Sequence, residues 1–185
     1  RPGRVVGALL NDVGPHIEPA GLKRIRDYVG QGRSFPTWMH AAWALSEVQG
    51  AVFPGFVISD WLDMAKKAMK VGPGGRIVYD YDMKIAEPFA VPGGEAGVDL
   101  WPALTGLAPV PVLIVRGALS DLFSQATAQR MLGVLPQGRL LTVEGKGHAP
   151  SLEEPEVADA IADLLARVDA AERAAQLATP LATLA

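Results

Sequence analysis

The sequence predicts an α/β fold in which parallel strands, joined through helices, are interrupted by one long insertion. Three apolar runs, at residues 5–10, 110–115 and 140–143, lack the polar alternation of a half-exposed strand and resemble strands buried on both faces of a sheet. A helical pattern separates the second run from the third, at a spacing typical of the crossover between parallel neighbours. Residues 17–109, between the first and second runs, are too many for a connecting loop. We therefore expect a parallel sheet that carries a lid or cap.

The insertion is predicted to be mainly helical. Helices are expected at residues 19–29, 36–48 and 60–70, with Ser34 and Ser59 as N-caps of the second and third, followed by an extended segment at 76–79. The whole chain then divides into a first core strand and loop at 1–16, the cap and its return at 17–109, the remaining core at 110–170, and a tail at 171–185.

Two more helices are predicted in the second half of the core. The first covers residues 124–135, with Ser124 as its N-cap and one apolar stripe of Ala128, Met131, Leu132 and Leu135. The second follows Ser151 and Glu154, which have the spacing of a capping box. Its apolar face continues to Val168, and beyond about Arg173 we expect a frayed tail.

Composition removes several classes of function. The 185 residues include no cysteine, so disulfides, zinc–thiolate sites and cysteine nucleophiles are excluded, and a cytoplasmic location is expected. The net charge is −3 and no long basic run exists, so we expect no nucleic-acid partner. No apolar stretch approaches the roughly 20 residues of a membrane span. The three histidines lack metal-ligand spacing, and we expect neither a metal nor a cofactor.

Candidate catalytic residues follow the second and third predicted strands. Asp121 lies six residues past Val115, and His148 lies five past Val143. Ligands bind at the carboxyl ends of parallel strands, so both side chains are expected at one rim of the sheet. A carboxylate beside an imidazole there suits a general base whose tautomer the acid fixes. The alternatives are that His148 is a structural loop residue and that Asp121 is only a turn or N-cap residue.

Three loop motifs resemble the α/β-hydrolase superfamily. Asn-Asp-Val-Gly-Pro at 11–15, Arg-Gly-Ala-Leu-Ser-Asp-Leu at 116–122 and Gly-Lys-Gly-His-Ala-Pro at 145–150 are similar to the loops after the sixth, seventh and eighth strands of that family. The insertion resembles the helical cap that follows the family's sixth strand. The resemblance implies a partial parallel sheet, made of the last three strands, with Asp121 as the acid and His148 as the base of a triad. Some members place the acid after the sixth strand, which leaves Asp12 as the rival acid.

The family's nucleophile motif is missing from these 185 residues. No G-x-S-x-G occurs, and none of the six serines lies between glycines on a strand-to-helix elbow. The resemblance therefore implies that an N-terminal half of the same hydrolase is the partner that brings the nucleophile. We expect this chain alone to be inactive and to expose an unpaired apolar strand edge.

The resemblance implies hydrolysis of a small ester, lactone or related acyl substrate. Other chemistries on the same scaffold are a dehalogenase with an aspartate nucleophile, a cofactor-free haloperoxidase and a lyase, and a non-catalytic binding module is the alternative of a different class. Aromatic residues of the cap are candidates for substrate contacts, with packing inside the cap as the alternative; they are Trp38, Trp43, Phe53 and Trp61.

Overall fold

The computed structural model describes residues 4–87 and 99–178, which form two compact units. The larger unit consists of Arg1–Glu18 and Asp99–Ala185, and the smaller unit of Pro19–Val98. The smaller unit corresponds to the predicted insertion, but the return segment from residue 99 to residue 109 belongs to the larger unit.

The described part of the larger unit is built on a three-stranded parallel sheet in the order β1-β5-β6. The strands are β1 (Ala8–Asn11), β5 (Val112–Gly117) and β6 (Gly138–Val143). Ala8 pairs with Val112, which in turn pairs with Gly138. The predicted parallel order is confirmed. The first strand starts later than predicted because Val5 and Val6 are exposed and lie outside the ladder.

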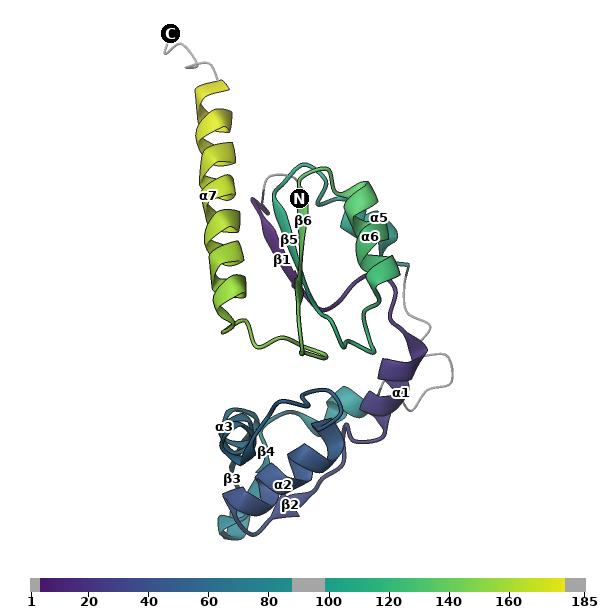
Figure 1. Ribbon diagram of the computed structural model, residues 1–185, viewed down its shortest axis with the longest axis vertical. Helices are drawn as coiled ribbons and strands as arrows, with labels where there is room; N and C mark the ends of the chain where they lie inside the picture. The colour runs from purple at the N-terminus through teal and green to yellow at the C-terminus, as the bar shows by residue number, and fades with distance from the viewer. Residues whose placement is uncertain (1–3, 88–98, 179–185) are drawn as a thin grey trace. The chain divides into compact units, whose positions relative to one another are not determined.

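Helices cover both faces of this sheet (Figure 1). One face packs against α5 (Trp101–Thr105) and α6 (Gln125–Val134), through a core that includes Ile114, Phe123 and Met131. The other face packs against α7 (Pro155–Ala178), through Val115 and Val157 among others. All six residues of β5 are buried, which explains why its sequence is apolar at consecutive positions.

The helix ends agree with the sequence in one case and correct it in another. Ser124 is the N-cap of α6, with its hydroxyl 3.2 Å from the amide of Thr127, as predicted. Ser151 is not the N-cap of α7, because the helix begins at Pro155. The amide and the hydroxyl of Ser151 both donate to the Glu154 carboxylate.

The helix α7 also continues to Ala178, beyond the predicted end near Arg173, because its alanine-rich last turns have high helix propensity. Of the predicted tail, residues 179–185 lie outside the described residues.

The smaller unit contains the three predicted helices, α1 (Pro19–Arg26), α2 (Trp38–Gln49) and α3 (Ile58–Ala68). It also contains an antiparallel sheet in the order β2-β4-β3, formed by β2 (Ser34–Phe35), β4 (Ile77–Tyr79) and β3 (Met69–Val71). Two single 3-10 turns, η1 (Pro73–Gly75) and η2 (Met83–Ala86), also lie in the described part of this unit. The extended segment predicted at 76–79 is thus β4, whereas β2 and β3 are too short to give a sequence pattern.

Two predicted caps of the smaller unit are wrong. Thr37, not Ser34, caps α2, because Ser34 lies in β2 and pairs with Val78. The third helix begins after Val57 rather than at Ser59, and the Asp60 carboxylate accepts the Val57 amide at 2.8 Å. In the described part of the chain, no helix combines the length and the apolar character needed to cross a membrane.

Candidate active site

A buried aspartate and a partly exposed histidine meet at the carboxyl ends of the parallel strands. Asp12 is the first residue after β1, and His148 lies in the loop after β6. The Oδ2 atom of Asp12 is 2.8 Å from Nδ1 of His148. The Asp12 side chain is fully buried, whereas the His148 side chain is 25% exposed. A carboxylate at Nδ1 holds the imidazole proton there and leaves Nε2 free to accept one, which is the arrangement of a general base.

Two further donors hold the Asp12 carboxylate in place. The amide of Gly117 donates to Oδ1 at 2.8 Å, and the hydroxyl of Ser120 donates to Oδ2 at 2.6 Å. Both donors come from the end of β5 and the loop that follows it. Burying a carboxylate removes its hydration, and hydrogen bonds to the charged form offset that cost. These hydrogen bonds hold the buried Asp12 carboxylate in one orientation.

The backbone of Asp12 adopts a left-handed conformation, with φ of 54°. Few residues other than glycine adopt it, although aspartate and asparagine tolerate it better than most. Such conformations are concentrated at functional sites, where the surrounding structure holds them. Here the turn carries the Asp12 carboxylate from an outer strand toward the middle of the sheet, where its partners lie.

Gly117 makes the meeting of the two outer strands possible. Because the order is β1-β5-β6, Asp12 and His148 belong to strands that are not neighbours, and they meet across the end of β5. Gly117 ends β5, and a Cβ atom there would overlap the carbonyl oxygen of Gly147 and lie 2.6 Å from that of Lys146. A side chain at this position would separate the histidine loop from the strand end.

Replacing Gly117 with alanine is expected to destabilise the protein by about 1–3 kcal/mol, the usual cost of forcing a methyl group into a packed site. The matched control is Gly133→Ala in α6, where an added Cβ meets no atom within 4 Å and the alanine improves helix propensity. Urea unfolding of the purified variants measures both. Equal unfolding midpoints for Gly117→Ala and the wild type would contradict the close approach described here.

Other hydrogen bonds fix the loops around the pair. The side-chain amide of Asn11 donates to the carbonyl of Pro150 at 3.0 Å, and the amide of Leu119 donates to the carbonyl of Lys146 at 2.8 Å. The buried Arg116 donates from Nε to the carbonyl of Phe123 at 2.9 Å. These contacts join the three strand-end loops into one assembly.

Glu154 contacts residues on both sides of His148 in the loop, Lys146 and Ser151. Burial by itself raises the pKa of the Glu154 carboxyl, but hydrogen bonds from its own amide and from the amide and hydroxyl of Ser151 outweigh burial. The ammonium group of Lys146, 3.5 Å away, acts in the same direction, so the pKa lies below its ordinary value of 4.5. The charged carboxylate thereby ties the loop before His148 to the start of α7.

This lowered pKa predicts a pH dependence of stability. A carboxyl whose pKa is lower in the folded state stabilises the protein fully above its ordinary pKa of 4.5, and that contribution is lost as the pH falls through the folded-state value. Glu154→Gln is expected to cost about 1 kcal/mol near neutral pH and progressively less in acid. Urea unfolding over a pH series measures this difference, with the exposed Glu144→Gln as control. A constant difference across the series would contradict the assignment.

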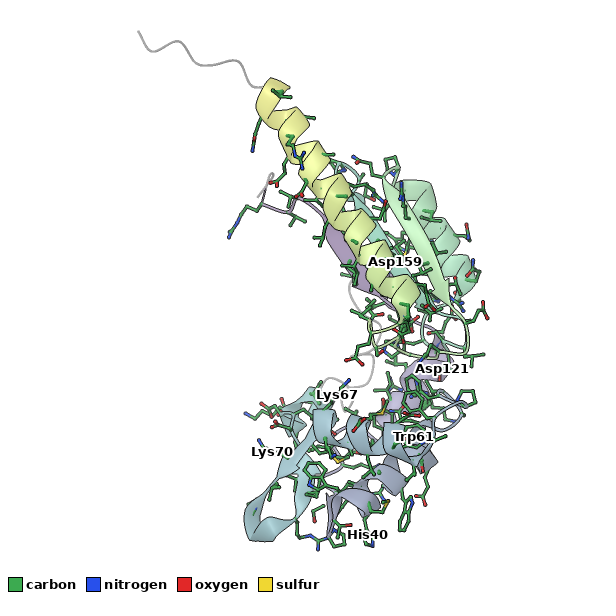
Figure 2. All side chains as sticks on the ribbon, turned by 60° about the vertical axis from the view of Figure 1, so that its left-hand side comes forward. His40, Trp61, Lys67, Lys70, Asp121 and Asp159 are labelled. Atoms are coloured by element: carbon green, nitrogen blue, oxygen red, sulfur yellow. The ribbon has the colours of Figure 1, made fainter. Side chains whose placement is uncertain are left out.

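The sequence favoured Asp121 as the acid beside His148, whereas the carboxylate at Nδ1 in the structure is that of Asp12, which the sequence left as the rival acid. Asp121 lies on the loop after β5 (Figure 2). The end of β5 and this loop provide two hydrogen-bond donors to Asp12, Gly117 and Ser120. The feature of the sequence that indicates Asp12 as a site residue is its position directly after a strand.

The aromatic residues expected to contact substrate belong to the smaller unit. Trp61, labelled in Figure 2, and Phe53 belong to its core. Their exposed fractions are 4% and 7%, and their ring centroids are 6.3 Å apart. Trp38 packs against the same core, whereas Trp43 is exposed and touches His40 edge-on. For Phe53 and Trp61, packing inside this unit accounts for the side chains, which is the alternative that the sequence left open.

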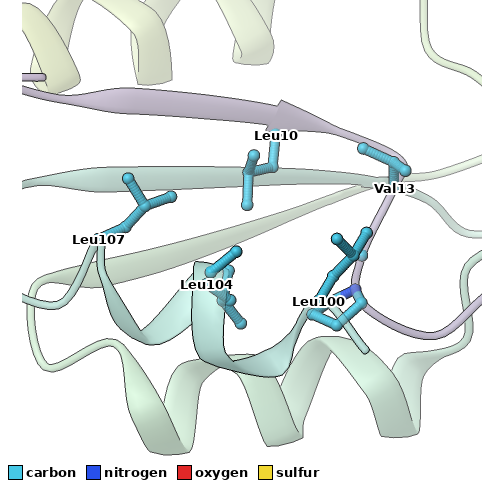
Figure 3. A pocket seen from close by; sticks show the side chains of 8 residues that line it. Leu10, Val13, Leu100, Leu104 and Leu107 are labelled. Carbon is cyan, nitrogen blue, oxygen red and sulfur yellow. The ribbon is translucent and has the colours of Figure 1, made fainter. Parts of the chain in front are cut away.

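An apolar pocket of about 280 Å³ lies in the larger unit at the end of β1 (Figure 3). Its walls come from the end of β1 with the following turn and from the region of α5: Leu10, Val13, Gly14, Pro15, Leu100, Ala103, Leu104 and Leu107. None of the four predicted aromatic residues lines it. In residues 4–87 and 99–178, no three His, Asp or Glu side chains are grouped so that they could hold a metal ion.

Comparison with known proteins finds hydrolases. No family model matches the chain. Over 156 residues, the chain is 31% identical to a 3-hydroxybutyrate-oligomer hydrolase of Cupriavidus necator, a match that covers 80% of this chain and 52% of that protein. The chain therefore spans about half the length of this relative.

Solved structures give the same picture. The crystal structure of an alpha/beta hydrolase from Novosphingobium aromaticivorans is 52% identical, with a TM-score of 0.84, and the match covers 90% of this chain and 59% of that one. E-2-(acetamidomethylene)succinate hydrolase is 24% identical with a TM-score of 0.69, covering 89% of this chain and 59% of its own, a likeness of fold alone.

Proposed function

This chain belongs to the α/β-hydrolase superfamily, and on that premise we propose that it supplies the acid, Asp12, and the general base, His148, of a hydrolase. The observation that carries the proposal is the fully buried Asp12 carboxylate at Nδ1 of His148. In this role Nε2 of His148 takes the proton of a nucleophilic hydroxyl and returns it to the leaving group. Asp12 keeps the imidazole in the required tautomer and stabilises the imidazolium that forms.

The nucleophile of this hydrolase is assigned to a segment outside residues 1–185. None of the six serines stands in a G-x-S-x-G motif, and Ser120 is engaged by Asp12. The match covers only 52% and 59% of the two relatives, which leaves room for that segment in the N-terminal half of the same hydrolase. We call this chain together with the nucleophile-bearing segment the complete protein.

The proposed substrate is a small ester, lactone or related acyl compound. The name of the Cupriavidus necator relative, a hydrolase of 3-hydroxybutyrate oligomers, supports an ester. The pocket between the turn after β1 and the region of α5 has apolar walls, which suit the uncharged part of such a molecule.

The experiment that tests the proposal is labelling of the complete protein with a serine-directed fluorophosphonate, followed by peptide mapping. We expect one covalent adduct on a serine outside this chain, and loss of turnover of phenyl esters and lactones in proportion to labelling. This chain alone is expected to take up no label and to turn over neither substrate. An unlabelled complete protein that dehalogenates a haloalkane would replace the serine mechanism with an aspartate nucleophile.

A further inference from the structure

We propose that Ser120 is a positioning residue of the acid: its hydroxyl fixes the Asp12 carboxylate and sets the basicity of His148. This inference rests on the proposed function, because it assigns a role within the same Asp12–His148 pair. It concerns a serine that is neither the nucleophile nor a member of the triad.

The hydroxyl contacts the same carboxylate oxygen as the imidazole. Oδ2 of Asp12 lies 2.6 Å from Oγ of Ser120 and 2.8 Å from Nδ1 of His148, while Oδ1 accepts the Gly117 amide at 2.8 Å. A carboxylate oxygen has two lone pairs. With Ser120 on one lone pair of Oδ2, the other is directed at the imidazole, and rotation of the carboxylate would break all three contacts.

The direction of the Ser120–Asp12 hydrogen bond follows from the other partners of Ser120. Oγ accepts the amide of Leu122 at 3.3 Å and the amide of Phe123 at 3.0 Å. A hydroxyl has one proton and two lone pairs, and both lone pairs are thus occupied. The proton must be donated, and the acceptor within reach is Oδ2 of Asp12. Oδ2 therefore accepts from Ser120, which leaves the imidazole to donate from Nδ1.

A backbone hydrogen bond in the loop after β5 holds Ser120 beside Asp12. The amide of Ser120 donates to the carbonyl of Gly117 at 3.0 Å, closing a turn directly after β5. Gly117 and Ser120, the two ends of this turn, each donate to Asp12. The turn thus acts as a clamp whose two donors come from one short rigid segment.

Removing the Ser120 hydroxyl changes how strongly the Asp12 carboxylate attracts a proton on His148. Without this donor the Asp12 carboxylate is less stabilised, so it attracts the imidazolium form of His148 more strongly. A larger share of His148 would then be protonated at a given pH, and a protonated ring cannot accept the nucleophile's proton. The carboxylate would also lose one of the contacts that aim it.

The test uses Ser120→Ala and Ser120→Thr in the complete protein, with phenyl ester turnover measured across pH. Ser120→Ala is expected to lower kcat about tenfold, in line with the loss of one hydrogen bond to a charged group, and to leave KM within about twofold. The acid limb of the kcat/KM profile is expected to move to higher pH. Ser120→Thr keeps the hydroxyl and is expected to restore both kcat and the profile.

The matched control is Ser124→Ala, four residues along the same loop. Ser124 caps α6 and donates to the hydroxyl of Thr127 at 3.0 Å, so its loss lowers stability without a change at the Asp12 carboxylate. Its acid limb is expected to stay in place. Should Ser120→Ala fail to fold, Ser120→Cys replaces it, since a thiol is a similar size but a weak donor, and the same shift is expected.

An acid limb that stays in place or moves to lower pH in the folded Ser120 variant overturns the proposal. So does an equal shift in Ser124→Ala, which would make the effect one of loop stability. This failure is distinguishable from failure of the proposed function. If His148→Ala abolishes turnover while the Ser120 variant matches the wild type, the hydrolase assignment stands and only the role of Ser120 falls.

Discussion

Replacing His148 with alanine in the complete protein is expected to reduce kcat by about 10⁴-fold or more, with a residual rate from substrate binding alone. In the proposed mechanism Nε2 of His148 removes the nucleophile's proton, and Asp12 has nothing to orient once the imidazole is gone. The double variant His148→Ala/Asp12→Asn should therefore be little slower than His148→Ala alone. Steady-state turnover of a phenyl ester measures all three rates.

His16→Ala is the control for this experiment, because His16 is exposed and lies near Glu18 rather than at the strand ends. Its turnover is expected to match the wild type. Wild-type turnover in a folded His148→Ala variant would exclude His148 as the general base and overturn the proposed function.

Replacing Asp12 with asparagine is expected to lower kcat by about 10³–10⁴-fold, because an amide at Nδ1 allows the imidazole to adopt the wrong tautomer. Asparagine suits this test because it tolerates the left-handed backbone of Asp12 and has nearly the same shape. An alanine would add backbone strain to the loss of charge. Asp121→Asn is the matched comparison, and its kcat is expected to stay near the wild-type value.

The reverse result would return the acid to the position favoured by the sequence. If Asp121→Asn abolished turnover and Asp12→Asn left it intact, the contact between Asp12 and His148 would be structural. Circular dichroism and urea unfolding of both variants show whether a change in kcat reflects chemistry or loss of fold.

The sequence predicted the central strand of the parallel sheet because β5 is buried on both faces. β5 is apolar at consecutive positions for that reason, and α6 carries its cap, Ser124, where capping chemistry puts it. Burial and caps leave local patterns that can be read residue by residue. The small sheet of the other unit leaves none, since β2 has two residues and β3 three.

The sequence predicted that His148 lies at the strand ends and named Asp121 and Asp12 as candidate acids, but it could not decide between them. Both aspartates follow predicted strands. Asp121 was favoured because it follows β5, which was expected to neighbour β6, the strand before His148. The structure selects Asp12 through two features that a linear sequence does not display: the left-handed backbone of Asp12, and the close approach of Gly117 to the histidine loop. Both are products of three-dimensional packing at the strand ends.

The most direct test of the Asp12–His148 pair is nitrogen-15 NMR of the His148 imidazole in the complete protein, at a pH where the ring is neutral. We expect the ring proton to reside on Nδ1, to give a downfield resonance protected from exchange, to survive Asp121→Asn, and to disappear in Asp12→Asn. A ring protonated on Nε2, or an Nδ1 proton that persists in Asp12→Asn and is lost in Asp121→Asn, would contradict the pairing.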